Sequence, residues 1–451
     1  MKAVFKGVFL LNGDFDGAKA QAALAAGEAD AITFGRTFLA NPDLPRRIKE
    51  AAPLNKDDKS TWYTQGREGY LDYPALDGGT GGAGAPQRYL RYSPDVETIQ
   101  PDEAQAIDGI IRAMTKQSTI VAQREHDHAV RASHAKSTGL AVGEMTILPN
   151  LPTELAQGLF AKSGSYKVAV RFAQGPGETL PDKVSTHRGM AIKVFGVEGE
   201  KLPGHSDETQ DFVPATGATF PSGTAQKFLK DEKQILTATG LPAGIQTGLK
   251  SAVSAIMRNA NLLLQAIGSG SSKAGFFGHP FTPPLSDSYH SQAPIRYGDY
   301  VAKIAAFPVT PAMKALAGTR VDVKKDPDGF RHATVGFFRE NDVIFDLRVQ
   351  LWTSPKSQPI EDTSVEWPES ESPYVTVATI TLPRQEAYSP ERQRFFDDIM
   401  TFRPAHSLVA HRPLGSIMRA RLKVYEALSA FRHKHNAIKS EEPADPARIP
   451  A

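Results

Sequence analysis

A glycine-rich segment near the N-terminus divides this chain into two unequal parts. Residues 77–87 read DGGTGGAGAPQ and contain five glycines and one proline. Glycine widens backbone freedom and proline interrupts regular hydrogen bonding, so the segment favours a linker over a helix or strand. We predict an N-terminal part at 1–76, a linker at 77–91 and a larger part at 92–437. The polar, proline-rich end predicts a disordered tail at 438–451.

The composition of the 451 residues limits the class of protein. Apolar residues make up 40% and charged residues 23%, as in globular proteins with a sizeable core. The net charge of +2 offers no bulk field for nucleic acid or an anionic membrane, so we expect neither as a partner. The absence of cysteine excludes disulfides, thiolate metal sites, iron–sulfur clusters and cysteine nucleophiles. No apolar run reaches the roughly 20 residues of a membrane span or forms a signal-peptide core. We expect a cytoplasmic protein without an integral membrane segment.

The N-terminal part has the pattern of two successive strand–turn–helix units. Apolar runs predict the strands, and alanine-rich or proline-initiated segments predict the helices. The expected elements are a strand at 4–11, a helix at 18–29, a strand at 30–36 and a helix at 41–51. Such short βα units indicate a piece of a parallel α/β structure.

These units resemble the last quarter of the Old Yellow Enzyme family of flavin-dependent alkene reductases. The resemblance rests on LLNGDFD, on ALAAGEADAITFGRTFLANPDLPRRIKEAAPLN and on TWYTQGREGYLDYPAL. It implies a flavin-phosphate site at Asn12–Gly13 and Gly35–Arg36, since backbone N–H groups and an arginine suit a phosphate. A complete (β/α)₈ barrel needs about 250 residues, and the first six units of such a barrel are missing from this sequence. We therefore expect a non-catalytic βα fragment of a TIM barrel.

The larger part alternates between strand and helix patterns. Residues 165–173, SYKVAVRFA, place a tyrosine, two valines and a phenylalanine on one face, which predicts a half-buried strand. Similar patterns predict strands at 187–197, 343–352 and 374–382 and helices at 102–123, 224–268 and 419–433. This mixture indicates an α+β domain built on an antiparallel sheet or barrel.

Three histidines lie close together in HDHAVRASHAKSTG, residues 126–139. His126, His128 and His134 have a spacing that could bind zinc or copper. The simpler interpretation is that His126 and His128 are solvated loop residues.

The helix at 419–433 carries an unusual stripe. Arg421, Tyr425 and Arg432 share one face on a 3.6-residue period, beside apolar positions. A Tyr–Arg packing pair would account for two of these residues, and a ligand site would account for all three.

Several motifs in the same order along the chain resemble haem catalases. They are RASHAKSTG around His134, VAVRFA…PGE around Arg171, HRGMAIKVFGVEGE, and the R-x-x-x-Y relation of Arg421 and Tyr425. TQDF, RYGDY and PIED resemble the compact catalase-related subfamily that includes allene oxide synthase domains. The resemblance covers roughly residues 92–437. It implies a catalase-like antiparallel β-barrel with inserted and C-terminal helices, and a haem b cofactor.

The resemblance assigns the iron side of the site to the C-terminal helix. Tyrosine is the haem ligand of catalases, so Tyr425 would bind the iron. The Arg421 guanidinium, one turn before it, would favour the phenolate form, and Arg432 would add positive field two turns later.

The opposite side of the haem would be formed by earlier segments. His134 would act as general base, and Arg131 and Arg171 would pair with the haem propionates. Catalases have an asparagine beside this histidine, and the matching position here is Thr216, with Asp207 or Glu208 under another alignment. A threonine hydroxyl is shorter than an asparagine amide and directs its hydrogen bond differently. We expect this difference to lower the efficiency of hydrogen peroxide dismutation and to leave O–O cleavage largely intact.

These residues together predict a haem enzyme that cleaves the O–O bond of hydrogen peroxide or an organic hydroperoxide, in oxidative-stress defence. One alternative is a lipid hydroperoxide isomerase or dehydratase, with the apolar segment 252–267 lining a lipid path. Another is a non-catalytic haem-binding protein. Relatives of catalase often form oligomers, so the resemblance leaves a homo-oligomer open.

Overall fold

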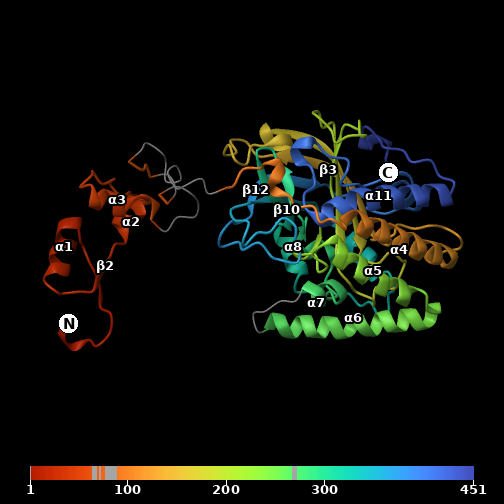
Figure 1. The fold of residues 1–451 in the computed structure, drawn as a ribbon, viewed down its shortest axis with the longest axis horizontal. Coiled ribbons are helices and arrows are strands. Elements are labelled where there is room, and N and C mark those ends of the chain that lie inside the picture. Colours follow the sequence, from red (N-terminus) through yellow and green to blue (C-terminus); the bar gives the residue numbers. More distant parts are fainter. Residues whose placement is uncertain (1, 63–68, 71–72, 77–88, 267–271, 451) are drawn as a thin grey trace. The chain divides into compact units, whose positions relative to one another are not determined.

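The chain forms two compact units, residues 1–88 and 89–451. The computed structural model describes residues 2–62, 69–70, 73–76, 89–266 and 272–450 (Figure 1). Residues 77–88 of the predicted linker lie outside the described residues. Residues 89–91 belong to the larger unit, where the Leu90 N–H donates to the Trp352 carbonyl at 2.8 Å.

The N-terminal unit has the predicted order of strands and helices but a shorter first strand. It contains β1 (Leu10–Asn12), α1 (Gly17–Ala25), β2 (Ala31–Thr33), α2 (Arg36–Ala40) and α3 (Leu44–Lys49). The strand predicted at 4–11 is wrong for most of its length, because β1 pairs in parallel with β2 only from residue 10. Val4, Phe5 and Val8 are exposed. The helix predicted at 41–51 begins later, since Asn41 ends α2 and its side-chain amide donates to the Thr37 carbonyl.

The larger unit is built on a closed antiparallel barrel. Its ring consists of β3 (Ser137–Ile147), β4 (Gly164–Gln174), β5 (Arg188–Phe195), β7 (Ala215–Thr216), β8 (Tyr289–His290), β10 (Tyr300–Pro308), β11 (Val343–Leu351) and β12 (Val375–Leu382). The β12–β3 and β10–β11 pairings close the ring. β6 (Thr209–Phe212) adds to β5, and β9 (Ile295–Tyr297) adds to β10. The α+β prediction and the four predicted strands are confirmed.

The barrel is covered on its outside as well as filled inside. Val170, Phe172 and Phe345 point into the interior core. On the opposite face of β4, Ala169 packs with Phe396 in a second apolar cluster. The strand predicted as half-buried is therefore buried on both faces from Val168 to Gln174, because a later segment of the chain covers its outer face.

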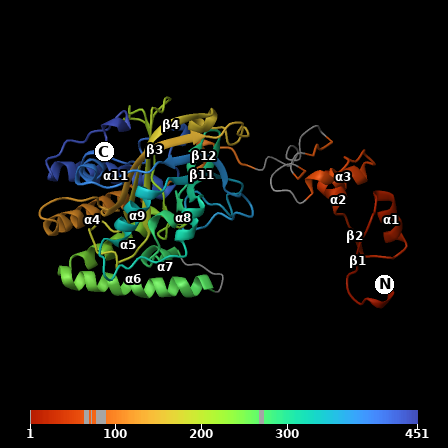
Figure 2. The ribbon, with the colours of Figure 1, turned by 180° about the vertical axis from the view of Figure 1, so that it is seen from behind.

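Helices surround the barrel. They are α4 (Glu103–Arg124), α5 (Ala225–Thr239), α6 (Ala243–Ala266), α7 (Ser272–Phe277), α8 (Pro311–Leu316), α9 (Gly329–Glu340), α10 (Pro390–Arg394) and α11 (Ser416–His435). Short 3₁₀ turns and one π-helical turn complete the order: η1 (Lys2–Val4), η2 (Lys59–Thr61), η3 (Pro94–Val96), η4 (Gly158–Ala161), η5 (Pro284–Ser286), π-helical η6 (Phe395–Ile399), η7 (Val409–His411) and η8 (Pro446–Arg448). Figures 1 and 2 show α4, α5 and α11 side by side, where Ile110, Ala225 and Val424 share one apolar cluster.

The helix predicted at 224–268 is two helices, since α5 ends at Gly240. Helix α6 turns the apolar residues Leu249, Val253 and Ile256 outward, while Ser254 is buried and donates to the Ser185 carbonyl. The side chains of residues 262–266 and residue 267 lie outside the described structure, so the lipid path along 252–267 stays a prediction. Within the described part of the chain, no helix combines the length and the hydropathy needed to cross a membrane.

The C-terminal residues pack on the barrel. Ile449 is buried in the cluster that covers β4, and the Lys167 ammonium pairs with Asp445 at 2.8 Å. Glu442 lies 3.2 Å from the buried Lys193 ammonium. Residues 438–450 are therefore ordered, whereas the composition predicts a disordered tail at 438–451. A few contacts with residues distant in sequence hold this segment on the barrel.

Candidate functional site

His134 lies on the loop between α4 and β3 in a conformation that needs support. Its φ of 56° is uncommon for a residue with a side chain. The His134 N–H donates to the Gly175 carbonyl at 3.0 Å, and the Ala135 N–H donates to the Pro176 carbonyl at 2.9 Å. These two bonds hold the loop against the end of β4 and fix the direction of the imidazole.

The imidazole of His134 lies against the backbone at Gly189 and against the ring of His187. A Cβ atom at Gly189 would come within 2.7 Å of the His134 Nδ1. The ring meets that of His187 edge-on, with centroids 5.1 Å apart, and His187 stacks on Phe276 at 3.6 Å. Each Nδ1 of the two histidines is buried with no hydrogen-bond partner among the described residues. Gly189 therefore provides the space that this ring occupies.

Both histidines stay neutral near pH 7. Burial, reinforced by His187 and by the charges of Arg171 and Arg421, holds the pKa of His134 well below its usual value. Burial alone lowers the pKa of His187 to about 4. A neutral imidazole keeps one nitrogen lone pair, so His134 can accept a proton.

Arg171 supports the loop that carries His134. Its Nη2 donates to the His134 carbonyl at 2.8 Å and to the Ala135 carbonyl at 3.2 Å. Its Nε donates to Asp397 at 2.7 Å, and Ser137 donates to the other oxygen of that carboxylate at 2.9 Å. The guanidinium is 3% exposed and already has these partners. The propionate contact expected of Arg171 stays a prediction.

Two further arginines form a buried positive cluster with Arg171. Burial and the charges of Arg432 and Arg171 lower the pKa of Arg131, and burial lowers the pKa of Arg432 to about 10. The Nη2 of Arg131 donates to the Met400 carbonyl at 2.9 Å. The Nε atoms of Arg131 and Arg432 are buried with no partner in the described structure. The carboxylates of Asp397 and Asp398 oppose these shifts, and the unpaired Nε atoms remain able to bind an anionic group such as a carboxylate.

Helix α11 brings Tyr425 and Arg421 to the same site. The Arg421 Nη2 donates to the Tyr425 hydroxyl oxygen at 3.1 Å and to the Val213 carbonyl at 3.0 Å. Arg421 is also one of the charges that lower the pKa of His134. The loop before β3 and the last helix thus contribute to one electrostatic environment.

Thr216 lies one strand from the His134 ring. Its neighbour Ala215 pairs with Gly189 in the sheet, and the Thr216 hydroxyl accepts the Arg188 N–H at 3.0 Å. The hydroxyl hydrogen is not used in that bond and can be donated elsewhere. The alternative position, Asp207, belongs to another cluster, with its carboxylate 3.8 Å from the His406 Nε2.

The other two histidines of the 126–139 segment do not join His134. His126 is exposed. The His128 Nε2 pairs with Asp398 at 3.0 Å. The structure does not support the zinc or copper interpretation of this trio.

The motifs did not identify three contributors to the site. Asp397 lies on the π-helical turn η6, 226 residues after its partner Arg171. No pattern in the sequence around Asp397 predicts this contact. His187 is the first residue of the motif HRGMAIKVFGVEGE, but the resemblance implies no role for it. Gly189 carried a usable signal, because a glycine inside a strand pattern marks a close approach.

Comparisons with known proteins find different relatives for a segment at the N-terminus and for most of the chain. No family model matches. The N-terminal segment is 49% identical over 77 residues to putative 12-oxophytodienoate reductase 10 of Oryza sativa subsp. japonica, covering 17% of this chain and 24% of that protein. It is 47% identical over 78 residues to 12-oxophytodienoate reductase 2 of Arabidopsis thaliana, covering 17% of this chain and 21% of that protein. The chain thus spans about a quarter or less of the curated relatives it matches.

The structure of catalase A from Saccharomyces cerevisiae superposes with a TM-score of 0.50 and 15% sequence identity. The alignment covers 73% of this chain and 69% of that one, which exceeds what the N-terminal unit could supply. A likeness at this identity concerns the fold. The unit at residues 89–451 has the catalase-like fold, a closed antiparallel barrel surrounded by helices.

Proposed function

We propose that the larger unit is a haem-dependent oxidoreductase that cleaves the O–O bond of hydrogen peroxide or of an organic hydroperoxide. One observation carries this proposal: a neutral, enclosed His134 and an Arg421-bonded Tyr425 share one electrostatic environment inside a catalase-like fold. A buried cluster of arginines with unpaired Nε atoms adjoins them.

The residues present fit a haem b. Tyr425 would bind the iron through its phenolate oxygen, which the Arg421 guanidinium stabilises from 3.1 Å. Arg131, whose Nε is unpaired, and Arg171 would pair with the propionates. Arg171 also holds the loop that carries His134, and Arg432 would add positive field. When bound, the haem supplies the redox chemistry that acts on the peroxide.

His134 would move the proton of the peroxide. In its neutral form it takes the proton from one oxygen and returns it to the departing oxygen, so that water leaves rather than hydroxide. The depressed pKa keeps His134 in this form at neutral pH. The Thr216 hydroxyl, in place of an amide, would offer one hydrogen bond to the substrate.

The N-terminal unit has no catalytic role in this proposal. It contains two paired strands, whereas a barrel that encloses a flavin needs eight. The guanidinium expected to bind the flavin phosphate, that of Arg36, contacts the Asp14 carboxylate.

The experiment that tests the function compares wild type with His134→Ala after expression with ample haem. Wild type is expected to show a high-spin ferric haem spectrum. It should also evolve oxygen from hydrogen peroxide or oxidise a phenolic donor. His134→Ala should keep the haem spectrum and lose about 10²- to 10⁴-fold in rate, because the general base is gone. His126→Ala, an exposed residue of the same segment, should retain full activity.

The readouts separate the alternatives. A colourless protein, or a His134→Ala variant as active as wild type, would contradict the proposal. Haem binding without any turnover would indicate a non-catalytic haem protein. Consumption of a lipid hydroperoxide alone would indicate an isomerase or dehydratase.

Adding a methyl group at Gly189 should disturb His134 without removing it. In Gly189→Ala the new Cβ would lie 2.7 Å from the His134 Nδ1, so the ring must shift. We expect a loss of about ten- to a hundredfold in peroxide turnover, since small misplacements of a reacting group have effects of this size. The haem spectrum should persist. Gly164→Ala is the matched control, because a Cβ there meets no atom within 4 Å. Equal turnover in the two variants would contradict the placement of the ring.

A further inference from the structure

A second cluster of histidines and carboxylates forms where two distant segments of the larger unit run together. The Val409 N–H donates to the Glu200 carbonyl at 2.8 Å, and the Leu202 N–H donates to the Ser407 carbonyl at 3.1 Å. The Asp211 N–H donates to the His406 carbonyl at 2.7 Å. These backbone bonds place His406 beside the loop that follows β5.

Three side chains of this cluster bring imidazole nitrogen and carboxylate oxygen atoms, which are common metal ligands, close together. One ligand atom each from His205, Asp207 and His406 lies within 4.8 Å of the other two. The His406 Nε2 is 3.8 Å from an Asp207 oxygen, and the two imidazole centroids are 5.5 Å apart. His406 is buried, and the other two are partly exposed on the loop, so the cluster has access to solvent from one side.

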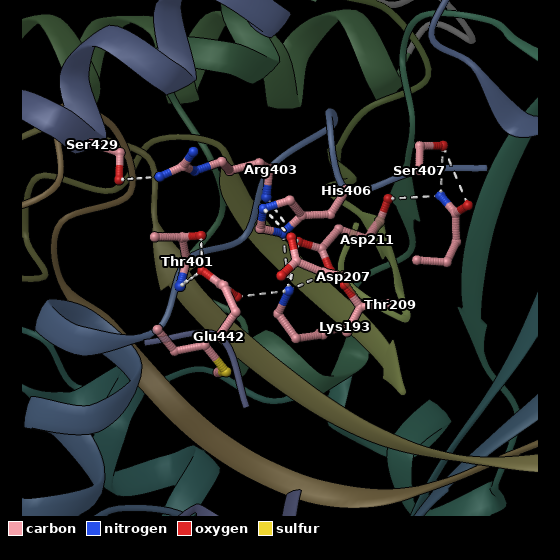
Figure 3. A network of polar contacts seen from close by, with 12 residues as sticks. Lys193, Asp207, Thr209, Asp211, Thr401, Arg403, His406, Ser407, Ser429 and Glu442 are labelled. Atoms are coloured by element: carbon pink, nitrogen blue, oxygen red, sulfur yellow. Dashed lines mark hydrogen bonds and ion pairs between the residues drawn. The ribbon is translucent and has the colours of Figure 1, made fainter. Parts of the chain in front are cut away.

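A buried carboxylate orients the deeper histidine. An Asp211 oxygen lies 3.0 Å from the His406 Nδ1, and Asp211 is itself held by the Lys193 ammonium at 2.8 Å (Figure 3). The ammonium also lies 3.1 Å from the same Nδ1, but it donates to both Asp211 oxygens. The His406 Nδ1 thus contacts Asp211, and its Nε2 faces an Asp207 oxygen. Metal-binding histidines are commonly oriented by a carboxylate in this way.

The charges around the cluster leave a negative excess. The carboxylates are Asp207, Glu208, Asp211, Glu426 and Glu442, and the cations are Lys193, Lys201 and Arg403. With the histidines left out of the count, five negative groups against three positive ones leave a difference of two charges. A divalent cation would balance this excess.

We propose that His205, Asp207 and His406 bind a divalent first-row transition-metal ion. Two imidazole nitrogens and one carboxylate favour zinc, copper or nickel over calcium or magnesium. Three protein ligands leave a fourth position of a tetrahedral ion open to water. Because none of the three belongs to the proposed haem site, this inference stands independently of the peroxide function.

The test uses Zn²⁺ as the probe on full-length protein freed of metal with EDTA. Equilibrium dialysis followed by elemental analysis should give one zinc per chain in wild type. His205→Ala and Asp207→Asn should each weaken zinc binding by about tenfold or more. Both positions lie on a partly exposed loop and leave the buried Asp211–Lys193 pair in place. The thermal midpoint and the haem spectrum of each variant should match wild type.

The matched control is His332→Ala. His332 is an exposed histidine whose Nδ1 lies 2.6 Å from an Asp326 oxygen. This pair has one histidine and one aspartate, as in the proposed site, but lacks the second histidine. Its removal should leave zinc binding unchanged. The inference is overturned if wild type binds no zinc, or if a His205→Ala/Asp207→Asn double variant binds it as tightly as wild type.

Discussion

A Tyr425→Phe variant is expected to lose the ferric haem spectrum of wild type and at least about 10²-fold of its peroxide turnover. The phenol oxygen is the atom that would bind the iron, and phenylalanine has no replacement for it. The substitution also leaves the Arg421 guanidinium without the acceptor that it has at 3.1 Å. Ultraviolet–visible absorption of the purified variant and an oxygen-electrode assay measure the two effects.

The control for this variant is Tyr388→Phe. Tyr388 is a half-buried tyrosine whose hydroxyl donates to Gln393 on α10 rather than to a residue of the proposed haem site. It should keep both the spectrum and the turnover of wild type. A Tyr425→Phe protein with an unchanged spectrum would show that another group binds the iron, and the assignment of α11 as the iron side of the site would be wrong.

Asp211→Ala is expected to lower the free energy of unfolding of the larger unit by about 3–5 kcal/mol. Asp211 and Lys193 are fully buried and paired at 2.8 Å, so removing the carboxylate leaves a buried ammonium with Glu442 alone. Guanidinium denaturation followed by circular dichroism measures the loss. Asp299→Ala removes the carboxylate of an exposed pair with Arg91 and should cost less than about 1 kcal/mol. Equal effects of the two substitutions would contradict the importance of burial.

The contribution of this pair depends on pH in a defined direction. Burial raises the pKa of Asp211, but Lys193 and His406 outweigh it and lower the pKa below the ordinary 3.8. Burial lowers the pKa of Lys193, but Asp211 and Glu442 raise it above the ordinary 10.5. The stabilisation is therefore present between pH 3.8 and 10.5. It is lost as pH falls through the folded pKa of Asp211 or rises through that of Lys193.

The sequence predicted several of the long elements but missed the long strands β3 (Ser137–Ile147) and β10 (Tyr300–Pro308). Alternation located β4, β5, β11 and β12, and a 3.6-residue period located α11 together with the stripe that holds Tyr425. Each of these carries enough residues for a period to appear. Strands β7 and β8, which complete the ring, have two residues each and leave no pattern.

The parts of the site that escaped prediction depend on contacts distant in sequence. Asp397 reaches Arg171 only because the segment after α10 folds over the outer face of the barrel. The C-terminal residues look disordered by composition, yet one buried isoleucine, Ile449, and two ion pairs hold them. The strand predicted at 4–11 is mostly absent because, among the described residues, β1 pairs only with the three-residue strand β2. Val4, Phe5 and Val8 therefore remain exposed.

The closed ring also sets an order of events during synthesis. Strand β3 needs β12 as its partner, with Ile147 opposite Ala378, and the site needs Tyr425 on α11. At about 5–20 residues per second, the 291 residues between His134 and Tyr425 take roughly 15–60 s to be made. For that time His134 has been synthesised but Tyr425 has not. Under the proposed function, haem capture through Tyr425 would therefore begin only after α11 has been made.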